Sequence, residues 1–230
     1  MPDLKPKLLD LYCGAGGCSA GYVRAGFDVT GVDLHPQPKY PFPFIQADAI
    51  EYLLTHWREF DAVHASPPCQ EHSPSTLVWK AAGKAYTDLV TPTRAALLQC
   101  GLPYAIENVP GAPLENAVLL CGTMFGLELY RHRLFETSFP LPQPWHREHM
   151  VKQAKMGRCP QPGEYMQVVG HFSGVPLARE AMEIPWMGQK ELAQAIPPAY
   201  TQYVGVVLLA HLAAEKNSFL QPSVNLNGGY

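Results

Sequence analysis

KLLDLYCGAGG, residues 7–17, joins a short apolar run to a turn of small residues. Residues 7–12 predict a buried strand, because the run is short, largely apolar and followed at once by glycine. Helical spacing predicts a helix over residues 19–25, directly after the turn. A strand, a glycine-rich turn and a helix in this order form the first unit of a fold in which strands and helices alternate.

The same alternation continues through the first half of the chain. We expect further strands over residues 27–33, 44–47, 60–65 and 103–107, and helices over 49–57 and 91–100. Beyond residue 110 the pattern loosens, although 133–137 fits a strand within a hairpin and 199–214 has helical periodicity. This order of elements predicts an α/β fold with a largely parallel sheet.

The composition is typical of a globular protein with one main domain. The 230 residues carry a net charge of −3, with 47% hydrophobic and 16% charged residues. No apolar run reaches the roughly 20 residues that a membrane span needs, and the first ten residues lack the apolar region of a signal peptide. We therefore expect a cytoplasmic protein, monomeric, with its six cysteines as free thiols.

Three of the predicted strands end in residues that suit a nucleoside-bearing ligand. Small residues at 13–17 follow the first strand, Asp33 ends the second, and Asp48 follows the third. In an open parallel sheet, ligands bind at the carboxyl ends of the strands. A nucleotide-binding oxidoreductase shares these features, as does a plain tight turn. The GxGG spacing departs from the GxGxxG pattern of dinucleotide sites, which disfavours the oxidoreductase.

Two further strand ends carry reactive side chains. Ser66-Pro67-Pro68-Cys69-Gln70 follows the fourth predicted strand, and Glu107-Asn108-Val109 ends the fifth. A buried structural cysteine is the ordinary alternative for Cys69. If the two strands are neighbours, however, the Cys69 thiol and the Glu107 carboxyl group share one cleft, where a buried Glu must be paired or protonated.

Taken together, these segments resemble the DNA cytosine-5 methyltransferases. LDLYCGAGG, GVDLHP, ADAI, SPPCQ, ENVPG and YRHR occur in the order of that family's motifs, and they cover residues 7–137. A fainter match, ELAQAIPPAYTQYVG, spans residues 191–205. The resemblance implies a Rossmann-like class I methyltransferase fold, S-adenosylmethionine as the methyl donor and double-stranded DNA as the partner. It also suggests a bacterial or phage protein, with roles in restriction-modification, self-protection or regulation left open.

The resemblance also implies catalytic roles. Cytosine C5 is too poor a nucleophile to accept a methyl group unaided, so a thiolate first adds to C6 and turns the ring into an enamine. Cys69 matches the family's nucleophile, and Glu107 matches the Glu that holds N3 and the exocyclic amine. Arg133, together with Arg131, matches the paired arginines near the cytosine O2 and the thiol.

The remaining site residues are carried over in the same way. The cofactor set is Tyr12, Cys13, Gly14, Gly16, Gly17, Asp33, Leu34, Asp48, Ala49, Pro68 and Gln194. A base within a duplex is inaccessible, so the target must be flipped out, and residues 71–88 match the family's closing loop. The DNA-binding set is Gln70, Ser73, Lys80 and Lys84 near this loop, with Arg147, Lys152, Lys155 and Arg158 in a basic segment. A solvated surface face is the alternative for that segment.

The chain departs from the family between the arginine motif and the last motif. We expect a catalytic domain at 1–137, a reduced recognition insert at 138–187, a returning segment at 188–216 and a mobile tail at 217–230. Leu129 stands where the family has Gln, and Ala193-Gln194 where it has Gly-Asn. These departures could weaken DNA or cofactor contacts, but they leave Cys69 and Glu107 in place.

No metal is predicted, although a weaker hypothesis remains for the insert. His146, His149, Cys159 and His171 could hold zinc as a staple for a small domain. Their spacing matches no known ligand pattern, and phosphate contacts would look the same. Other functions also stay open: DNA binding without turnover, transfer of another group from a modified sulfonium donor, and action on RNA or free nucleotides.

Overall fold

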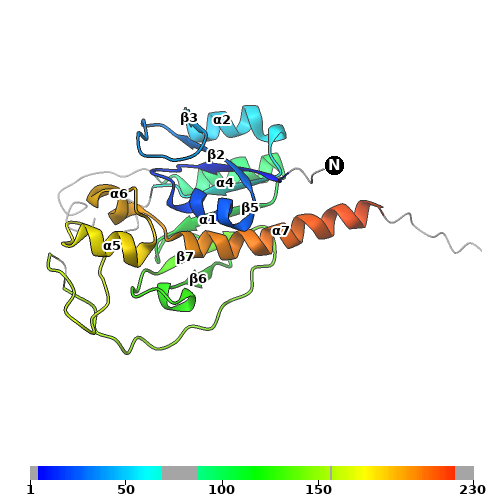
Figure 1. The fold of residues 1–230 in the computed structure, drawn as a ribbon. Coiled ribbons are helices and arrows are strands. Elements are labelled where there is room, and N and C mark those ends of the chain that lie inside the picture. The colour runs from blue at the N-terminus through cyan, green and yellow to red at the C-terminus, as the bar shows by residue number, and fades with distance from the viewer. Residues whose placement is uncertain (1–4, 69–87, 156, 221–230) are drawn as a thin grey trace, which may run out of the picture.

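In the computed structural model, which describes residues 5–68, 88–155 and 157–220, a seven-stranded sheet forms the centre (Figure 1). The strand order is β3-β2-β1-β4-β5-β7-β6. The strands are β1 (Lys7–Leu11), β2 (Asp28–Asp33), β3 (Phe44–Gln46), β4 (Ala62–Ala65), β5 (Tyr104–Asn108), β6 (Val118–Leu120) and β7 (Arg133–Thr137). The first five strands pair in parallel, whereas β7 runs antiparallel to both β5 and β6. The α/β fold with a largely parallel sheet is therefore confirmed.

The register of the sheet aligns the strand ends that carry the predicted chemistry. Leu11 of β1 lies opposite both Val32 of β2 and Ala65 of β4, and Ala65 in turn lies opposite Ile106 of β5. The chain order reverses at β1, which has β2 on one side and β4 on the other. In open α/β sheets this switch point is where ligands bind.

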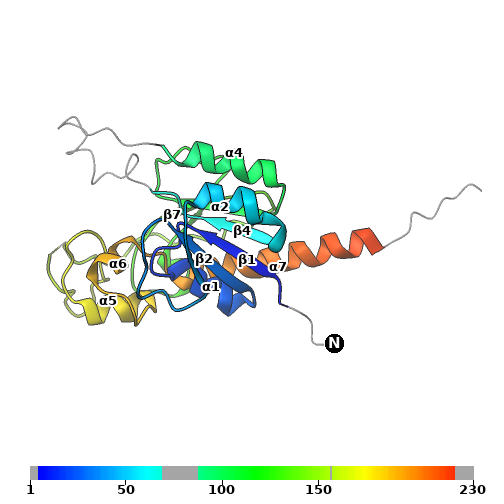
Figure 2. The same cartoon turned by 90° about the horizontal axis from the view of Figure 1, so that it is seen from above.

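Helices cover both faces of the sheet. Helices α1 (Gly17–Ala25) and α7 (Pro198–Leu220) lie on one face, and α2 (Ala49–His56) and α4 (Val90–Cys100) lie on the other (Figure 2). Alternate residues of β1 explain this arrangement, because Leu8 packs in the core beneath α1 and α7 while Leu9 and Leu11 pack beneath α2 and α4. Shorter helices are η1 (Trp57–Glu59), η3 (Gly122–Phe125), α5 (Val175–Met182) and α6 (Gln189–Gln194).

Close packing between α1 and α7 depends on two glycines. A Cβ added at Gly21 would lie 2.0 Å from the Thr201 hydroxyl, and one added at Gly205 would lie 2.7 Å from the Ala25 methyl group. Neither position has space for a side chain. The C-terminal helix is thereby held against the helix that follows the glycine turn.

A buried ion pair ties α4 to the antiparallel strand β7. Nε of Arg94 donates to Oε1 of Glu136 at 2.7 Å, and Nη2 of Arg94 donates to Oε2 at 2.6 Å. The Arg94 and Glu136 side chains are 12% and 5% exposed, so this bidentate contact lies largely out of water.

The structure alters several predicted boundaries. Helix α1 begins at Gly17 rather than 19, strand β6 was not among the predicted strands, and α5 is a helix within the insert, where no helix was predicted. Helix α7 continues through Leu220, past the start of the segment 217–230 that was expected to be a tail. Residues 138–174 otherwise contain no helix or strand in their described part, and they pass around the β6–β7 edge (Figure 1). Among the described helices, none has the length and apolar character of a membrane span.

Candidate functional site

The turn after β1 is shaped by left-handed backbone at three positions. Tyr12, Gly14 and Gly16 have φ values of 58°, 49° and 87°, a region that favours glycine. The amide of Gly16 donates to the Cys13 carbonyl at 3.0 Å, which closes the turn. A Cβ on Gly14 would meet nothing within 4 Å among the described residues, so this turn faces open space at the strand end.

Asp33 at the end of β2 faces the same turn. Its Oδ2 accepts a hydrogen bond from the Gly14 amide at 3.1 Å, and its Oδ1 accepts one from the His35 amide at 2.9 Å. A carboxylate offers about four acceptor positions, so each oxygen can accept one more bond. Leu34, the next residue in the cofactor set, is 59% exposed. The arrangement therefore leaves room and acceptors for a pair of hydroxyl groups.

Asp48 has a structural role that the sequence analysis missed. Its Oδ1 accepts hydrogen bonds from the amides of Ile50 and Glu51, both at 3.0 Å, and so caps the N-terminus of α2. The Asp-x-x-Glu pattern of residues 48–51 was the available signal for this cap. Ala49 is buried behind the cap, and the Tyr12 hydroxyl bonds to the Thr93 hydroxyl at 2.9 Å.

The C-terminal segment closes over the glycine turn. The indole Nε1 of Trp186 donates to the Ala15 carbonyl at 2.8 Å. A Cβ on Gly17 would lie 2.5 Å from the Ile196 carbonyl oxygen. Gln194, two residues before Ile196, is the last residue of α6 and is exposed. Pro68, which follows β4, is also exposed. The turn is thus packed between its own helix and residues 186–196.

Glu107 lies at the end of β5 and is almost wholly buried. Its Oε1 is 3.0 Å from Nε of Arg133, at the start of β7. Burial raises the pKa of the Glu107 carboxyl group, and this effect is opposed by the Arg133 charge, by a hydrogen bond with Ser66 and by the Arg131 charge. The structure therefore brings together Glu107 and Arg133, two of the predicted catalytic residues.

The segment that leads to Cys69 is fixed beside Glu107. The Ser66 amide donates to the Leu11 carbonyl at 3.1 Å, and the side-chain amide of Asn108 donates to the Pro67 carbonyl at 3.0 Å. Cys69 itself lies outside the described residues, as do Gln70, Ser73, Lys80 and Lys84. Their predicted roles remain predictions.

Arg131 has different partners from those expected of a residue at the cytosine. Its guanidinium donates to the carbonyl oxygens of Val168 and Ala193, the latter at 2.8 Å. Its own carbonyl accepts a bond from the Tyr200 hydroxyl at 2.6 Å. Arg131 is 4% exposed, and it ties the start of β7 to the insert, to α6 and to α7.

Two buried titratable residues behind the strand ends were also missed. Burial raises the pKa of Asp10 to about 7, with a hydrogen bond from Ser19 opposing the shift. Burial lowers the pKa of His64 to about 3. The His64 ring bonds to the Tyr22 hydroxyl at 3.0 Å and to the Ser66 hydroxyl at 2.9 Å. His64 therefore supports the same Ser66 that bonds Glu107.

The predicted DNA-binding residues of the insert do not form one free basic face. Lys152 and Arg158 both pair with Glu164, at 3.1 Å and 2.6 Å. Arg147 lies over the Trp145 ring, 5.1 Å from its centroid, and Lys155 is exposed. Arg147 and Lys155 are the better placed of the four to contact phosphate.

The insert also contributes two residues to a group of potential metal ligands. His146 and His149 lie together, as the zinc hypothesis required, but their neighbours are Cys121 and His132. Neither Cys159 nor His171 belongs to a group of potential ligands in the described part of the chain. Both are exposed.

The strand order, the reversal at β1 and the glycine turn facing Asp33 define a Rossmann-like fold, which this chain shares with methyltransferases of known structure. Three solved methyltransferase structures illustrate this similarity of fold. A prophage-encoded protein of E. coli, described as a "putative DNA modification methyltransferase", has a TM-score of 0.62 and 12% identity, covering 91% of this chain and 100% of its own.

Two further methyltransferases have somewhat lower TM-scores. The Dnmt2 methyltransferase of S. pombe has a TM-score of 0.58 and 13% identity, over 91% of this chain and 99% of its own. The methyltransferase EhMeth of Entamoeba histolytica has a TM-score of 0.55 and 12% identity, over 93% and 99%. No protein-family model and no curated protein matches the sequence. The shared fold is what these likenesses establish.

Proposed function

We propose that this protein is a DNA cytosine-5 methyltransferase that uses S-adenosylmethionine and forms a covalent adduct through Cys69. One observation carries the proposal: buried Glu107 bonds Arg133 at 3.0 Å, while its neighbour Asn108 holds Pro67, two residues before Cys69, at 3.0 Å. This pairing of strand ends lies on the same sheet edge as the open turn at Gly14. The methyltransferase fold and the DNA-modifying description of the prophage protein agree with it.

The glycine turn fits a donor with a ribose. Asp33 retains acceptor positions for two hydroxyl groups, and Gly14 leaves open space next to them. Tyr12 and Ala49 would border the methionine and adenine ends. When bound there, S-adenosylmethionine would supply the methyl group as an electrophilic sulfonium, and the breaking sulfur–methyl bond would leave its sulfur as a neutral thioether.

The protein's own groups prepare the cytosine. Cys69 adds as a thiolate, so that a bond forms between sulfur and C6 and an electron pair becomes available at C5. Glu107, whose pKa is raised by burial, holds a proton at N3 and accepts from the exocyclic amine as the adduct forms. Arg133 holds Glu107 in place and presents positive charge beside it. After transfer, a base removes the C5 proton, the bond to sulfur breaks and the thiolate is regenerated.

The substrate that fits this chemistry is a cytosine flipped out of duplex DNA. Phosphate contacts would come from Arg147 and Lys155 in the insert and from Lys80 and Lys84 in the segment after Cys69. Because the insert is small, we propose a short or relaxed target sequence, read by a monomer in the cytoplasm of a bacterium or an infected host cell. Restriction-modification, phage protection and regulation are all compatible with this activity.

The direct test is methyl transfer from labelled S-adenosylmethionine to DNA of varied sequence, followed by nucleoside analysis. We expect label in 5-methylcytosine, and none with Cys69→Ser. Cys159→Ser is the matched control, since Cys159 is exposed and remote in sequence from the strand ends, and it should retain activity. Label in another methylated base would reject the C5 chemistry, and DNA binding without label would leave a binding protein.

A further inference from the structure

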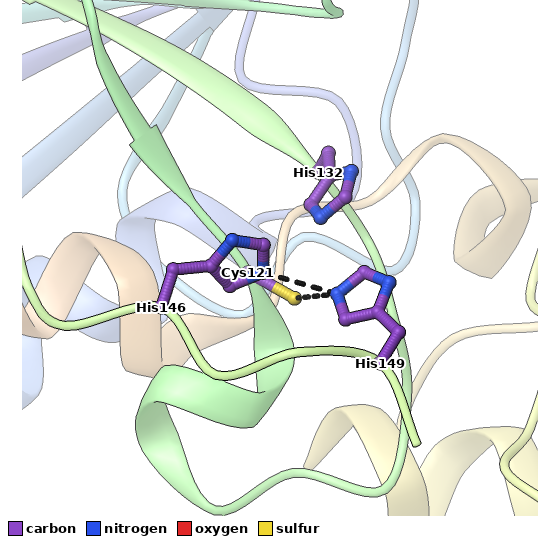
Figure 3. A group of neighbouring side chains, drawn as sticks. All are labelled: Cys121, His132, His146 and His149. Carbon is purple, nitrogen blue, oxygen red and sulfur yellow. Dashed lines mark hydrogen bonds between the residues drawn. The ribbon is translucent and has the colours of Figure 1, made fainter. Parts of the chain in front are cut away.

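Four side chains gather at the β6–β7 edge of the sheet, and neither Glu107 nor Arg133 is among them. Cys121, His132, His146 and His149 each offer one nitrogen or sulfur atom, and these atoms all lie within 4.8 Å of one another. The Cys121 sulfur is 3.4 Å from Nε2 of His149, which is 3.0 Å from Nε2 of His146. Figure 3 shows the four side chains converging on one point.

Strand register supplies two of the ligands. Leu120 of β6 lies opposite Arg133 of β7, so the next pair outward is Cys121 and His132. Successive residues of an extended chain point to opposite sides. The His132 ring is therefore directed away from the side chains of Arg131 and Arg133, which lie before and after it.

The insert supplies the other two ligands, and it is clamped on either side of them. The Gln143 side chain bonds both the amide and the carbonyl of Leu119, at 3.1 Å and 2.8 Å. The Tyr130 hydroxyl bonds both the amide and the carbonyl of Val151, at 2.9 Å and 3.0 Å. Tyr130 also stacks on His149, with ring centroids 3.7 Å apart. The segment from Gln143 to Val151, which carries His146 and His149, is therefore held against the β6–β7 edge of the sheet.

Hydrogen bonding within the cluster leaves one polar atom unsatisfied. Nε2 of His132 is buried and has no hydrogen-bond partner among the described residues. A buried polar atom without a partner costs free energy, and its ring points toward the other three side chains (Figure 3). A bound cation would accept this lone pair. The Thr123 hydroxyl lies 3.3 Å from the Cys121 sulfur and would act as an outer hydrogen-bond partner.

We propose that Cys121, His132, His146 and His149 bind one Zn²⁺ ion in a closed tetrahedral site. Three imidazoles and one thiolate suit zinc, whereas Mg²⁺ and Ca²⁺ require oxygen ligands. A tetrahedral zinc site separates two nitrogens by about 3.3 Å and a nitrogen from a sulfur by about 3.6 Å. The corresponding separations here are 3.0 Å between the His146 and His149 nitrogens and 3.4 Å between the His149 nitrogen and the Cys121 sulfur. Binding forms the zinc–sulfur bond and releases the thiol proton to solvent.

With four protein ligands the site is structural, since a catalytic zinc keeps an open position. The zinc ion would join β6, β7 and the insert. One of its ligands, His132, is the residue between Arg131 and Arg133. The ion would therefore hold the strand that presents Arg133 to Glu107. The zinc site does not depend on the proposed methyl transfer, and metal content is measured without any activity assay.

The test is the metal content of tag-free protein, because polyhistidine tags bind zinc themselves. Elemental analysis should find about one zinc per chain, and Cys121→Ser and His149→Ala should lower it at least tenfold. Cys159→Ser and His171→Ala are matched controls, exposed and outside the cluster, and they should keep the full content. Equal zinc loss in the controls and the cluster variants would overturn the assignment.

A second measurement stays decisive even where a variant fails to fold. Wild-type protein stripped of metal by a chelator is titrated with Co²⁺, which reports tetrahedral geometry and thiolate ligation by its visible and near-ultraviolet absorption. We expect one equivalent to bind with both signatures, Zn²⁺ to displace it, and the melting temperature to rise with the metal. Absence of zinc from the purified protein, together with no Co²⁺ signal, would refute the site.

Discussion

The side-chain amide of Asn108 donates a hydrogen bond to the carbonyl oxygen of Pro67 at 3.0 Å. Its Oδ1 accepts from the amide of Val109 at 2.9 Å. One buried side chain thus fixes both the end of β5, which carries Glu107, and the turn after β4, which leads to Cys69. This contact sets the position of Pro67, two residues before the proposed nucleophile in sequence, relative to the end of β5 that carries Glu107.

Asn108→Ala tests that positioning role. Loss of the two bonds leaves the Pro67 carbonyl and the Val109 amide without these partners, which should cost about 1–3 kcal/mol of stability. Misplacement of the two strand ends should slow methyl transfer on the order of 10²-fold. Urea unfolding and single-turnover assays measure the two effects. Asn217→Ala, exposed near the end of α7, should change neither, and an active Asn108→Ala would remove the positioning role.

Arg133→Lys tests the contact between Arg133 and Glu107. The Arg133 charge lowers the Glu107 pKa against the larger effect of burial, so a displaced charge should raise that pKa further. The alkaline limb of the pH–rate profile should then move to higher pH, while the maximal rate falls by about 10²-fold. Arg24→Lys, in an exposed pair with Glu183, is the matched control. An unshifted alkaline limb would show that Glu107 does not set it.

The buried pair between Arg94 and Glu136 should contribute more to stability than the exposed pair between Arg24 and Glu183. Arg94→Ala leaves the Glu136 carboxylate buried and unpaired, which should cost about 3–5 kcal/mol. Arg24→Ala breaks the exposed pair with Glu183 and should cost less than about 1 kcal/mol. Chemical denaturation of both variants measures the difference. Equal losses would mean that the Arg94 contact is no stronger than a surface pair.

Asp10→Asn should make the protein more stable at neutral pH. Burial raises the folded-state pKa of Asp10 to about 7, above the unfolded value of about 3.9. The folded state then binds the proton more tightly, so this group's stabilisation is complete below about pH 3.9 and is lost as the pH rises through about 7. The variant stays neutral, so its advantage over wild type should grow from pH 4 to pH 8, reaching a few kcal/mol. A pH-independent difference would contradict the shift, and the exposed Asp28→Asn is the control.

Titration of His64 changes the folding stability in the direction opposite to that of Asp10 over the same pH range. Its pKa is lowered to about 3 by burial, so the stability that it contributes is present above about pH 6.5 and is lost as the pH falls toward 3. In wild type the Asp10 and His64 slopes partly offset each other between about pH 4 and 6.5. Asp10→Asn should therefore also lose stability more steeply on acidification than wild type does.

The sequence predicted the residues at strand ends because β-strands leave a short, readable pattern. The order of strand, turn and acid around Gly14 and Asp33 was enough to place the glycine turn opposite the carboxylate, and Glu107 was correctly put at the end of β5. These features depend on neighbours in sequence and on the general behaviour of parallel sheets.

Contacts between distant segments could not be predicted in this way. The partners of Arg131 are carbonyl oxygens at Val168 and Ala193, and backbone acceptors leave no trace in residue identity. The zinc ligands come from two strand ends and an irregular segment, so Cys121 and His132 have no regular spacing with His146 and His149. The β6–β7 register and the clamps at Gln143 and Tyr130 bring them together.

The central claim is tested most directly by intact-mass measurement of the protein after incubation with S-adenosylmethionine and duplex DNA containing 5-fluorocytosine. Fluorine at C5 cannot leave as a proton does, so the thiol stays bonded to C6. We predict a mass increase equal to one methylated DNA strand, located on Cys69 by peptide mapping and absent in Cys69→Ser. If 5-methylcytosine forms on ordinary DNA but no such adduct appears, or if the adduct maps to another residue, the account given for Cys69 is wrong.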